Sequence, residues 1–170
     1  MDRRRLILSA IVLTLVLGAC SGPTTPDELV ALAVATDPSG NVASPVKISA
    51  RAINAGWTPV WHYQGCGAGI GIGVQVLDSA GNELLLHDPS MMPACWDGIV
   101  ALGPAKELTL STSFVGTMFV RGENGYETAA VPPGDYVVRI TFAYSRNGSP
   151  PDVVLEETTS FRWLPPPPGL

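Results

Sequence analysis

Six side chains with thiol, thioether or imidazole groups fall within one short region of the chain. They are His62, Cys66, His87, Met91, Met92 and Cys95. Such soft ligands suit copper, whereas two cysteines in one region can instead form a disulfide. A blue-copper site needs a cysteine followed shortly by a histidine and a methionine. No histidine follows Cys95 in the sequence, and the next methionine is Met118. The sequence therefore predicts no metal site and keeps a copper-binding periplasmic protein as an alternative.

The third cysteine, Cys20, lies at the end of an apolar run. Three arginines precede that run, which extends from Leu6 to Ala19 and is shorter than the roughly 20 apolar residues of a membrane-spanning helix. The segment Leu17-Gly18-Ala19-Cys20 resembles the lipobox of bacterial lipoprotein precursors. The resemblance implies that residues 1–19 are a lipoprotein signal peptide and that the thiol of Cys20 accepts the diacylglyceryl group.

This processing predicts where in the cell the mature protein is located. Acyl chains on Cys20 would anchor it to the cell membrane or the outer membrane, with the domain on the extracytoplasmic side. The Pro- and Thr-rich residues 20–27 follow as a tether. In such a compartment disulfides persist, so the remaining even pair, Cys66 and Cys95, is predicted to form a structural bridge.

The sequence contains no recognisable catalytic constellation. It has two histidines, and no serine lies in a Gly-x-Ser-x-Gly context. Asp88 and Asp97 are interpreted as solvated loop residues or turn caps. We therefore expect a non-enzymatic protein without catalytic residues or a cofactor.

Aromatic and glycine residues gather near the two cysteines. Trp57, Trp61 and Tyr63 share parity and could line one strand face. We predict a binding surface here, although core packing is the alternative; its candidate residues are Trp61, Tyr63, Met91, Met92 and Trp96. Glycines at 67, 69, 71 and 73 leave one face of a strand without side chains. This face could lie close under another layer of the fold, or it could form a groove that the backbone of a partner approaches.

The charge of the chain argues against nucleic acid. Removing the signal takes away three arginines and Asp2, which leaves seven basic and fourteen acidic residues and a formal net charge of −7. The acidic residues are dispersed and no basic cluster remains. We therefore expect no nucleic-acid partner.

The elements that must position these residues are short strands. Apolar and polar residues alternate over 46–54, 106–114 and 136–144, and further strands are expected at 29–36, 58–63, 71–77, 83–87 and 153–163, with turn residues between them. This pattern predicts one all-β domain at 28–163, an antiparallel Ig-like β-sandwich of seven to eight strands. A polyproline tail follows at 164–170.

Three segments within 46–163 resemble the bacterial intracellular proteinase-inhibitor domain family and its exported Ig-like relatives. They are Asn54-Ala55-Gly56 before Thr58-Pro59-Val60, the strand and turn over 74–83, and Val131-Pro132-Pro133-Gly134-Asp135-Tyr136. The resemblance implies the sandwich fold and offers proteinase inhibition as a second function, with the loop at 90–94 as the inhibitory segment. Our first expectation is a lipid-anchored envelope lipoprotein that binds or scaffolds, with the membrane and another envelope protein as its partners.

Overall fold

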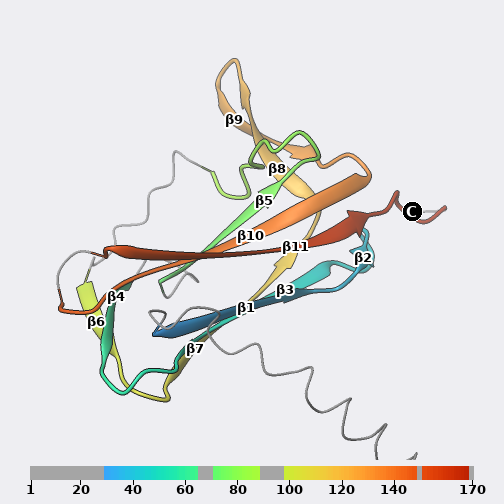
Figure 1. Cartoon of the computed structure of the whole chain (residues 1–170). Helices are drawn as coiled ribbons and strands as arrows, with labels where there is room; N and C mark the ends of the chain where they lie inside the picture. The colour runs from blue at the N-terminus through green and yellow to red at the C-terminus, as the bar shows by residue number, and fades with distance from the viewer. Residues whose placement is uncertain (1–28, 65–70, 89–97, 149–150, 169–170) are drawn as a thin grey trace, which may run out of the picture.

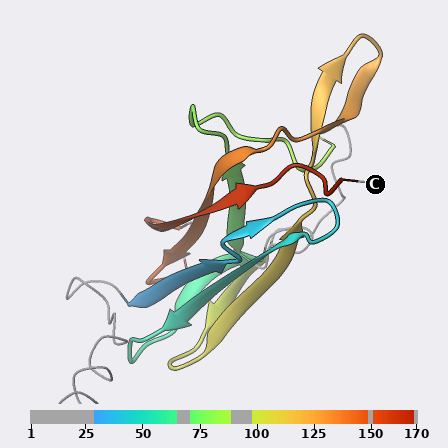
Figure 2. The ribbon, with the colours of Figure 1, turned by 90° about the vertical axis from the view of Figure 1, so that its right-hand side faces the viewer.

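The computed structural model describes residues 29–64, 71–88, 98–148 and 151–168. Two β-sheets pack face to face in this part of the chain (Figures 1 and 2). The smaller sheet consists of β1 (Val30–Thr36), β3 (Val46–Asn54) and β7 (Glu107–Phe114) in the order β1-β3-β7. Both of its strand pairs are antiparallel. We call it sheet A.

The larger sheet, sheet B, has the order β2-β11-β10-β4-β6. Its strands are β2 (Ser39–Gly40), β11 (Val153–Trp163), β10 (Gly134–Ser145), β4 (Val60–Gln64) and β6 (Gly98–Leu102), and β5 (Ile72–Leu77) also pairs with β10. All pairs are antiparallel except β2 with β11, which is parallel. The prediction of an antiparallel β-sandwich is confirmed.

β4 and β5 occupy successive parts of the same edge of β10. His62 of β4 pairs with Tyr144, and Ile72 of β5 pairs with Phe142. The chain thus leaves this edge after β4 and returns to it at β5. Gly71 makes the return possible because its φ is +71° and a Cβ there would lie 2.5 Å from Nδ1 of His62. The glycine at 71 therefore serves a close backbone approach within the sheet.

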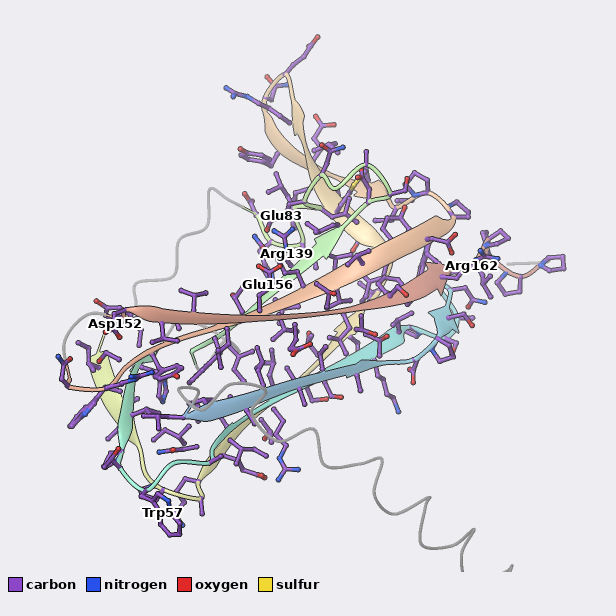
Figure 3. All side chains as sticks on the ribbon, in the orientation of Figure 1. Trp57, Glu83, Arg139, Asp152, Glu156 and Arg162 are labelled. Carbon is purple, nitrogen blue, oxygen red and sulfur yellow. The ribbon has the colours of Figure 1, made fainter. Side chains whose placement is uncertain are left out.

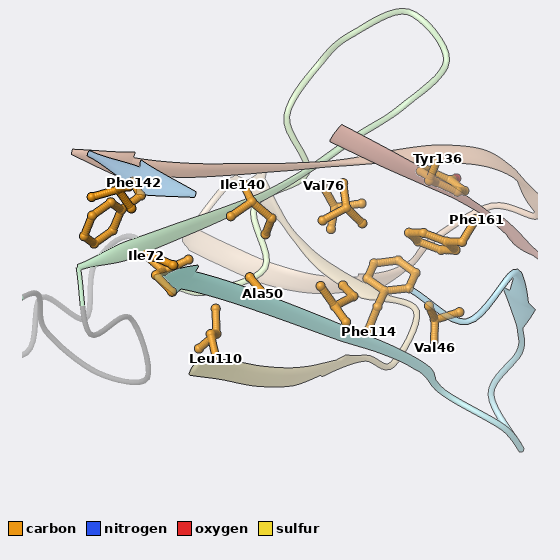
Figure 4. Packing of buried hydrophobic residues seen from close by; sticks show 14 of the residues in the cluster. Val46, Ala50, Ile72, Val76, Leu110, Phe114, Tyr136, Ile140, Phe142 and Phe161 are labelled. Atoms are coloured by element: carbon orange, nitrogen blue, oxygen red, sulfur yellow. The ribbon is translucent and has the colours of Figure 1, made fainter. Parts of the chain in front are cut away.

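The core lies between the two sheets and follows the alternation of the strands (Figure 4). All alternate residues of β3 from Val46 to Asn54 and of β10 from Tyr136 to Tyr144 are buried. The alternation predicted over 46–54 and 136–144 is confirmed as an alternation of buried and more exposed side chains. Their burial supplies most of the driving force for the fold, because it removes large aliphatic and aromatic surfaces from water.

An aromatic cluster closes the core where β10 begins and β11 ends. Phe114 contacts the rings of Tyr136, Phe161 and Trp163, with centroid distances of 6.1, 5.1 and 5.1 Å. The hydroxyl of Tyr136 donates to the carbonyl of Pro132 at 2.6 Å. Burial raises the pKa of this phenol, and the charge of Asp78 adds to the effect. The hydrogen bond thus satisfies a buried polar group.

A hairpin of β8 (Thr117–Gly122) and β9 (Gly125–Ala130) projects from the sandwich, and its tip is at the top of Figure 1. Figure 2 shows it at the opposite end of the molecule from the start of β1. One backbone hydrogen bond, from Phe119 N to Leu85 O at 2.7 Å, ties β8 to the segment after β5. The hairpin and strands β2 and β6 were not expected from the sequence.

The expected strand at 83–87 is wrong. Glu83 forms an isolated bridge with Leu77, and Leu84 N donates to Val76 O, but Leu85 O then accepts from β8. The segment divides its backbone groups between two neighbours, so no continuous ladder forms. The described residues form eleven strands. If the projecting strands β8 and β9 are left out, and β4 and β5 are counted as one interrupted strand, eight strands make up the two sheets. None of the described residues forms a helix that could cross a bilayer.

Candidate binding surface

The outer face of sheet B carries exposed apolar side chains where β4 and β6 pair. Val60 and His62 of β4 point into the core, so the alternating Trp61 and Tyr63 point outward. Tyr63 pairs with Ile99 of β6, and these side chains are 41% and 37% exposed. Trp61 pairs with Ala101 in the same ladder. Two predicted site residues, Trp61 and Tyr63, therefore lie on one surface.

The apolar face continues onto β10 and β11. Tyr144 faces inward opposite His62, so the preceding residue, Ala143, faces outward on the same side as Tyr63. Ala143 pairs with Val154, which is 66% exposed. Strands lie about 4.8 Å apart, so this row spans roughly 14 Å across four strands. We define Trp61, Tyr63, Ile99 and Val154 as the apolar strip.

Trp61 is the most firmly held member of the apolar strip. It pairs with Ser145 of β10, whose side chain is fully buried. A Cβ on Gly148, in the turn after β10, would lie 3.6 Å from the indole ring. The Ser145 hydroxyl has no hydrogen-bond partner within the described part of the chain. The indole therefore lies close to the turn that follows β10.

The two candidate imidazole ligands lie in different environments. His62 is 2% exposed, its ring lies 5.5 Å from that of Phe142, and its Nδ1 donates to the carbonyl of Tyr63 at 3.0 Å. His87 is exposed in the segment after β5. Among the described residues, no group of three or more His, Cys, Asp or Glu side chains could hold a metal. The core packing of His62 gives it a structural role.

The other predicted site residues lie outside the described residues. They are Cys20, Cys66, Met91, Met92, Cys95 and Trp96, and the inhibitory segment at 90–94 lies there too. The flanking residues are described: Gln64 at the end of β4 pairs directly with Gly98 at the start of β6. The segments that carry Cys66 and Cys95 therefore leave sheet B at neighbouring positions beside the apolar strip.

Trp57 is separate from the apolar strip. It lies in the loop between β3 and β4, its side chain is 96% exposed, and it points away from the ribbon in Figure 3. The shared parity of Trp57 with Trp61 therefore does not place the two on one strand face, because the chain turns between them. Sequence reasoning also missed Ile99 and Val154, although the alternation of Gly98-Ile99-Val100-Ala101-Leu102 is visible in the sequence.

The outer face of sheet A is different in chemistry. Apart from the partly buried Ile53, it presents small or polar side chains, and Arg51 forms an ion pair with Glu107. The outward residues, in register across the three strands, are Ala31, Ala33, Ala35, Lys47, Ser49, Arg51, Ile53, Glu107, Thr109, Ser111 and Ser113. None of the large apolar side chains exposed in the described residues belongs to β1, β3 or β7. This is an ordinary solvated face.

A further depression, open to solvent, lies at the tip of the β8–β9 hairpin. Asp88, Arg121, Glu123 and Tyr126 contribute to its lining. Gly122 and Gly125 close the hairpin there as a direct pair. The lining is mainly polar, which contrasts with the apolar strip.

Comparisons with known proteins do not assign the chain to a family. No family model matches it, and no curated protein matches it. Among solved structures, a mutant β-glucosidase from Listeria innocua in complex with laminaribiose is 11% identical, with a TM-score of 0.44, covering 80% of this chain and 16% of that chain. The same enzyme in complex with glucose is 10% identical, with a TM-score of 0.43, covering 86% and 19%. The chain thus spans less than a fifth of these two structures, and nothing about activity transfers from them.

Proposed function

We propose that this chain is a membrane-anchored envelope lipoprotein whose β-sandwich binds another envelope protein without catalysing a reaction. The observation that carries the proposal is the apolar strip on sheet B, set against the small and polar outer face of sheet A. Aromatic side chains that stay exposed and adjacent are characteristic of protein interfaces, where they anchor the partner.

The geometry of the apolar strip suits a preformed interface. Its four side chains come from paired strands rather than from loops, so their spacing is fixed by the ladder. The indole of Trp61 also lies close to Gly148, in the turn after β10. A surface ordered before binding loses little conformational freedom when the partner docks.

The anchor rests on the lipobox at residues 17–20, and its test is independent of the apolar strip. Cells that express the full chain should incorporate tritiated palmitate into it, and the protein should remain with membranes. The variant Cys20→Ser should lose both the label and the membrane association. Equal labelling of the two proteins would refute the anchor.

The proposed Cys66–Cys95 disulfide is supported by the strand register. Gln64 and Gly98 are direct partners, so the cysteines are two and three residues from a paired position. Residues this close to a ladder pair can reach the roughly 5.5–6 Å Cα separation of a disulfide. Alkylation of the denatured exported protein should modify neither cysteine until it is reduced. Two reactive thiols before reduction would refute the bridge.

The Ig-like character of the sandwich belongs to the same proposal. Sheet A has the order of the first, second and fifth strands of an Ig domain, and β11-β10-β4/β5 corresponds to its G, F and C strands. The Tyr136 hydroxyl bonded back to Pro132 is also the arrangement of an Ig tyrosine corner. Ig-like modules present binding surfaces on such sheets and loops, which agrees with a non-enzymatic role.

The binding role is tested by position-specific photocrosslinking in living cells. A crosslinking residue at Ile99 or Val154 should capture a discrete partner protein, whereas one at Ser111 or Ser113 on sheet A should not. Adding Tyr63→Ala to the Val154 probe should reduce the yield several-fold, because it removes an aromatic contact from the same row. Capture of the same products from both faces, or of none from sheet B, would overturn the proposal.

A further inference from the structure

Trp57 lies at the end of the sandwich where the described chain begins. The amides of Ala55 and Gly56 both donate to the carbonyl of Leu29, at 2.9 and 3.2 Å. A Cβ on Gly56 would lie 3.0 Å from a methyl group of Leu29. The loop that carries Trp57 is therefore packed directly against Leu29, two residues after the end of the expected tether at 20–27.

This loop is held in place by a buried polar residue. Asn54 is fully buried, and its side-chain amide donates to the carbonyls of Thr58 and Leu102, both at 2.8 Å. Its side-chain oxygen accepts from Gly56 N at 2.9 Å. The loop is thus tied to β6 and to its own two ends, so the exposure of Trp57 is a fixed feature of the fold.

The turn between β6 and β7 lies beside this loop. Ala105 N donates to Asn54 O at 2.9 Å, and Asn54 N donates to Lys106 O at 3.0 Å. Lys106 is exposed there, and the neighbouring Glu107 is paired with Arg51. The end of the domain therefore presents an indole together with an exposed ammonium group, a pairing that suits the interfacial region of a bilayer.

The length of the tether places this end closest to the lipid. Leu29 is the ninth residue after Cys20, and these nine steps of extended chain span at most about 32 Å. The twelve residues of β10 extend about 40 Å along the sandwich. The β8–β9 hairpin lies at the far end of this length (Figures 1 and 2). An anchor at Cys20 thus keeps the Trp57 end near the membrane and the hairpin away from it.

We propose that the Trp57 end of the sandwich docks on the lipid surface, with the indole of Trp57 in the headgroup region. This inference rests on the proposed lipid anchor at Cys20. It adds an orientation: the domain stands on its Trp57 end and holds the β8–β9 hairpin away from the lipid. A nearly fully exposed indole otherwise remains in water without any contact that explains it.

The test uses the full lipidated protein in vesicles of phosphatidylcholine with and without phosphatidylglycerol. Lipids with a nitroxide near the headgroup should quench part of the tryptophan emission of the wild type. The variant Trp57→Phe should lose more than about half of this lipid-dependent quenching, whereas Trp61→Phe should keep it. The chain has four tryptophans whose emission overlaps, so single Trp→Phe variants are needed to assign the quenching to one of them. Flotation of the vesicles reports the anchor separately.

The outcomes separate the two proposals. Wild-type protein that does not float with vesicles would overturn both the anchor and the docking. Protein that floats but shows no headgroup quenching, or the same quenching in Trp57→Phe, would overturn the docking alone. Loss of quenching in Trp57→Phe with normal flotation supports both. Thermal unfolding monitored by circular dichroism should be unchanged in this variant, because Trp57 packs against so little.

Discussion

The two ends of the sandwich use tryptophan in opposite ways. At the end where β11 finishes, Trp163 is 3% exposed and meets the ring of Phe114 edge-on at 83°. At the opposite end, Trp57 lies almost entirely in solvent on a loop that Asn54 holds in place. Both surroundings are well ordered, but only one of them buries the indole. The buried indole of Trp163 therefore contributes to the stability of the fold, whereas the exposed indole of Trp57 is accessible to another molecule or surface.

The largest expected effect comes from removing the buried indole. Trp163→Ala should lower the free energy of unfolding by about 3–5 kcal/mol, because it opens a cavity beside Phe114. Urea denaturation followed by far-UV circular dichroism measures this value. A loss below about 1 kcal/mol would mean that the aromatic cluster is not a main source of stability.

Gly116 offers a finer test of the same end. Its φ is +75°, and a Cβ there would overlap the Trp163 indole. Gly116→Ala should therefore cost about 1–3 kcal/mol for overpacking, in addition to the strain of a positive φ. Gly81→Ala is the matched control, because Gly81 has a φ of +84° with no atom within 4 Å. Equal destabilisation by the two variants would leave no role for the indole contact.

The polar bond within the buried end should contribute less. Tyr136→Phe removes the hydrogen bond to Pro132 and keeps the ring, so we expect a loss of about 1 kcal/mol. Tyr126→Phe on the projecting hairpin should change the unfolding free energy much less, since Tyr126 is exposed. Thermal unfolding of the two variants side by side gives the comparison. A stabilised Tyr136→Phe would contradict the assignment.

At the end that carries Trp57, Trp57→Ala should change the unfolding free energy by no more than about 0.5 kcal/mol. Trp61→Ala should have an effect between those of Trp163→Ala and Trp57→Ala, because its side chain is half-buried and its indole lies close to Gly148. Urea midpoints for the three tryptophan variants should therefore rank Trp163, Trp61, Trp57. A Trp57→Ala variant that unfolds as readily as Trp163→Ala would abolish the contrast between the ends.

The smallest expected effect is a surface pair beside Trp163. Hydrogen bonding from the Arg162 guanidinium lowers the pKa of Asp135. Because the folded-state pKa is lowered, the contribution is present above the unfolded value of about 3.9 and is lost as the pH falls through the folded value. Asp135→Asn should therefore weaken the protein slightly near pH 7 but not near pH 2. Unfolding midpoints at both pH values test this, and a larger effect in acid would contradict the sign.

Much of the sandwich could be predicted because its signals are local. The alternation in β3 and β10 identified the inward residues, and β3 and β11 have the expected bounds. The segment at 83–87 failed because its backbone groups are shared between β5 and β8, which no local pattern records. The hairpin was missed because its mostly exposed strands show little alternation in burial.

The candidate surface was only partly predictable. Trp61 and Tyr63 could be named from residue type and spacing, and they do point outward together. Ile99 and Val154 join them only because β6 and β11 flank β4 and β10 in the sheet. Adjacency between strands this far apart in the chain depends on tertiary pairing.

By itself, the sequence determined the class of fold and the inward faces of the long strands, because period-two alternation follows directly from strand geometry. It also placed tryptophans at 57, 61 and 163, among the four of the chain, without any means to rank their burial. Only the tertiary structure decided that Trp163 closes the core, that Trp61 is half-covered by a turn, and that Trp57 faces solvent. Burial depends on which surface lies opposite a side chain, and that surface comes from residues distant in the chain, such as Phe114 for Trp163.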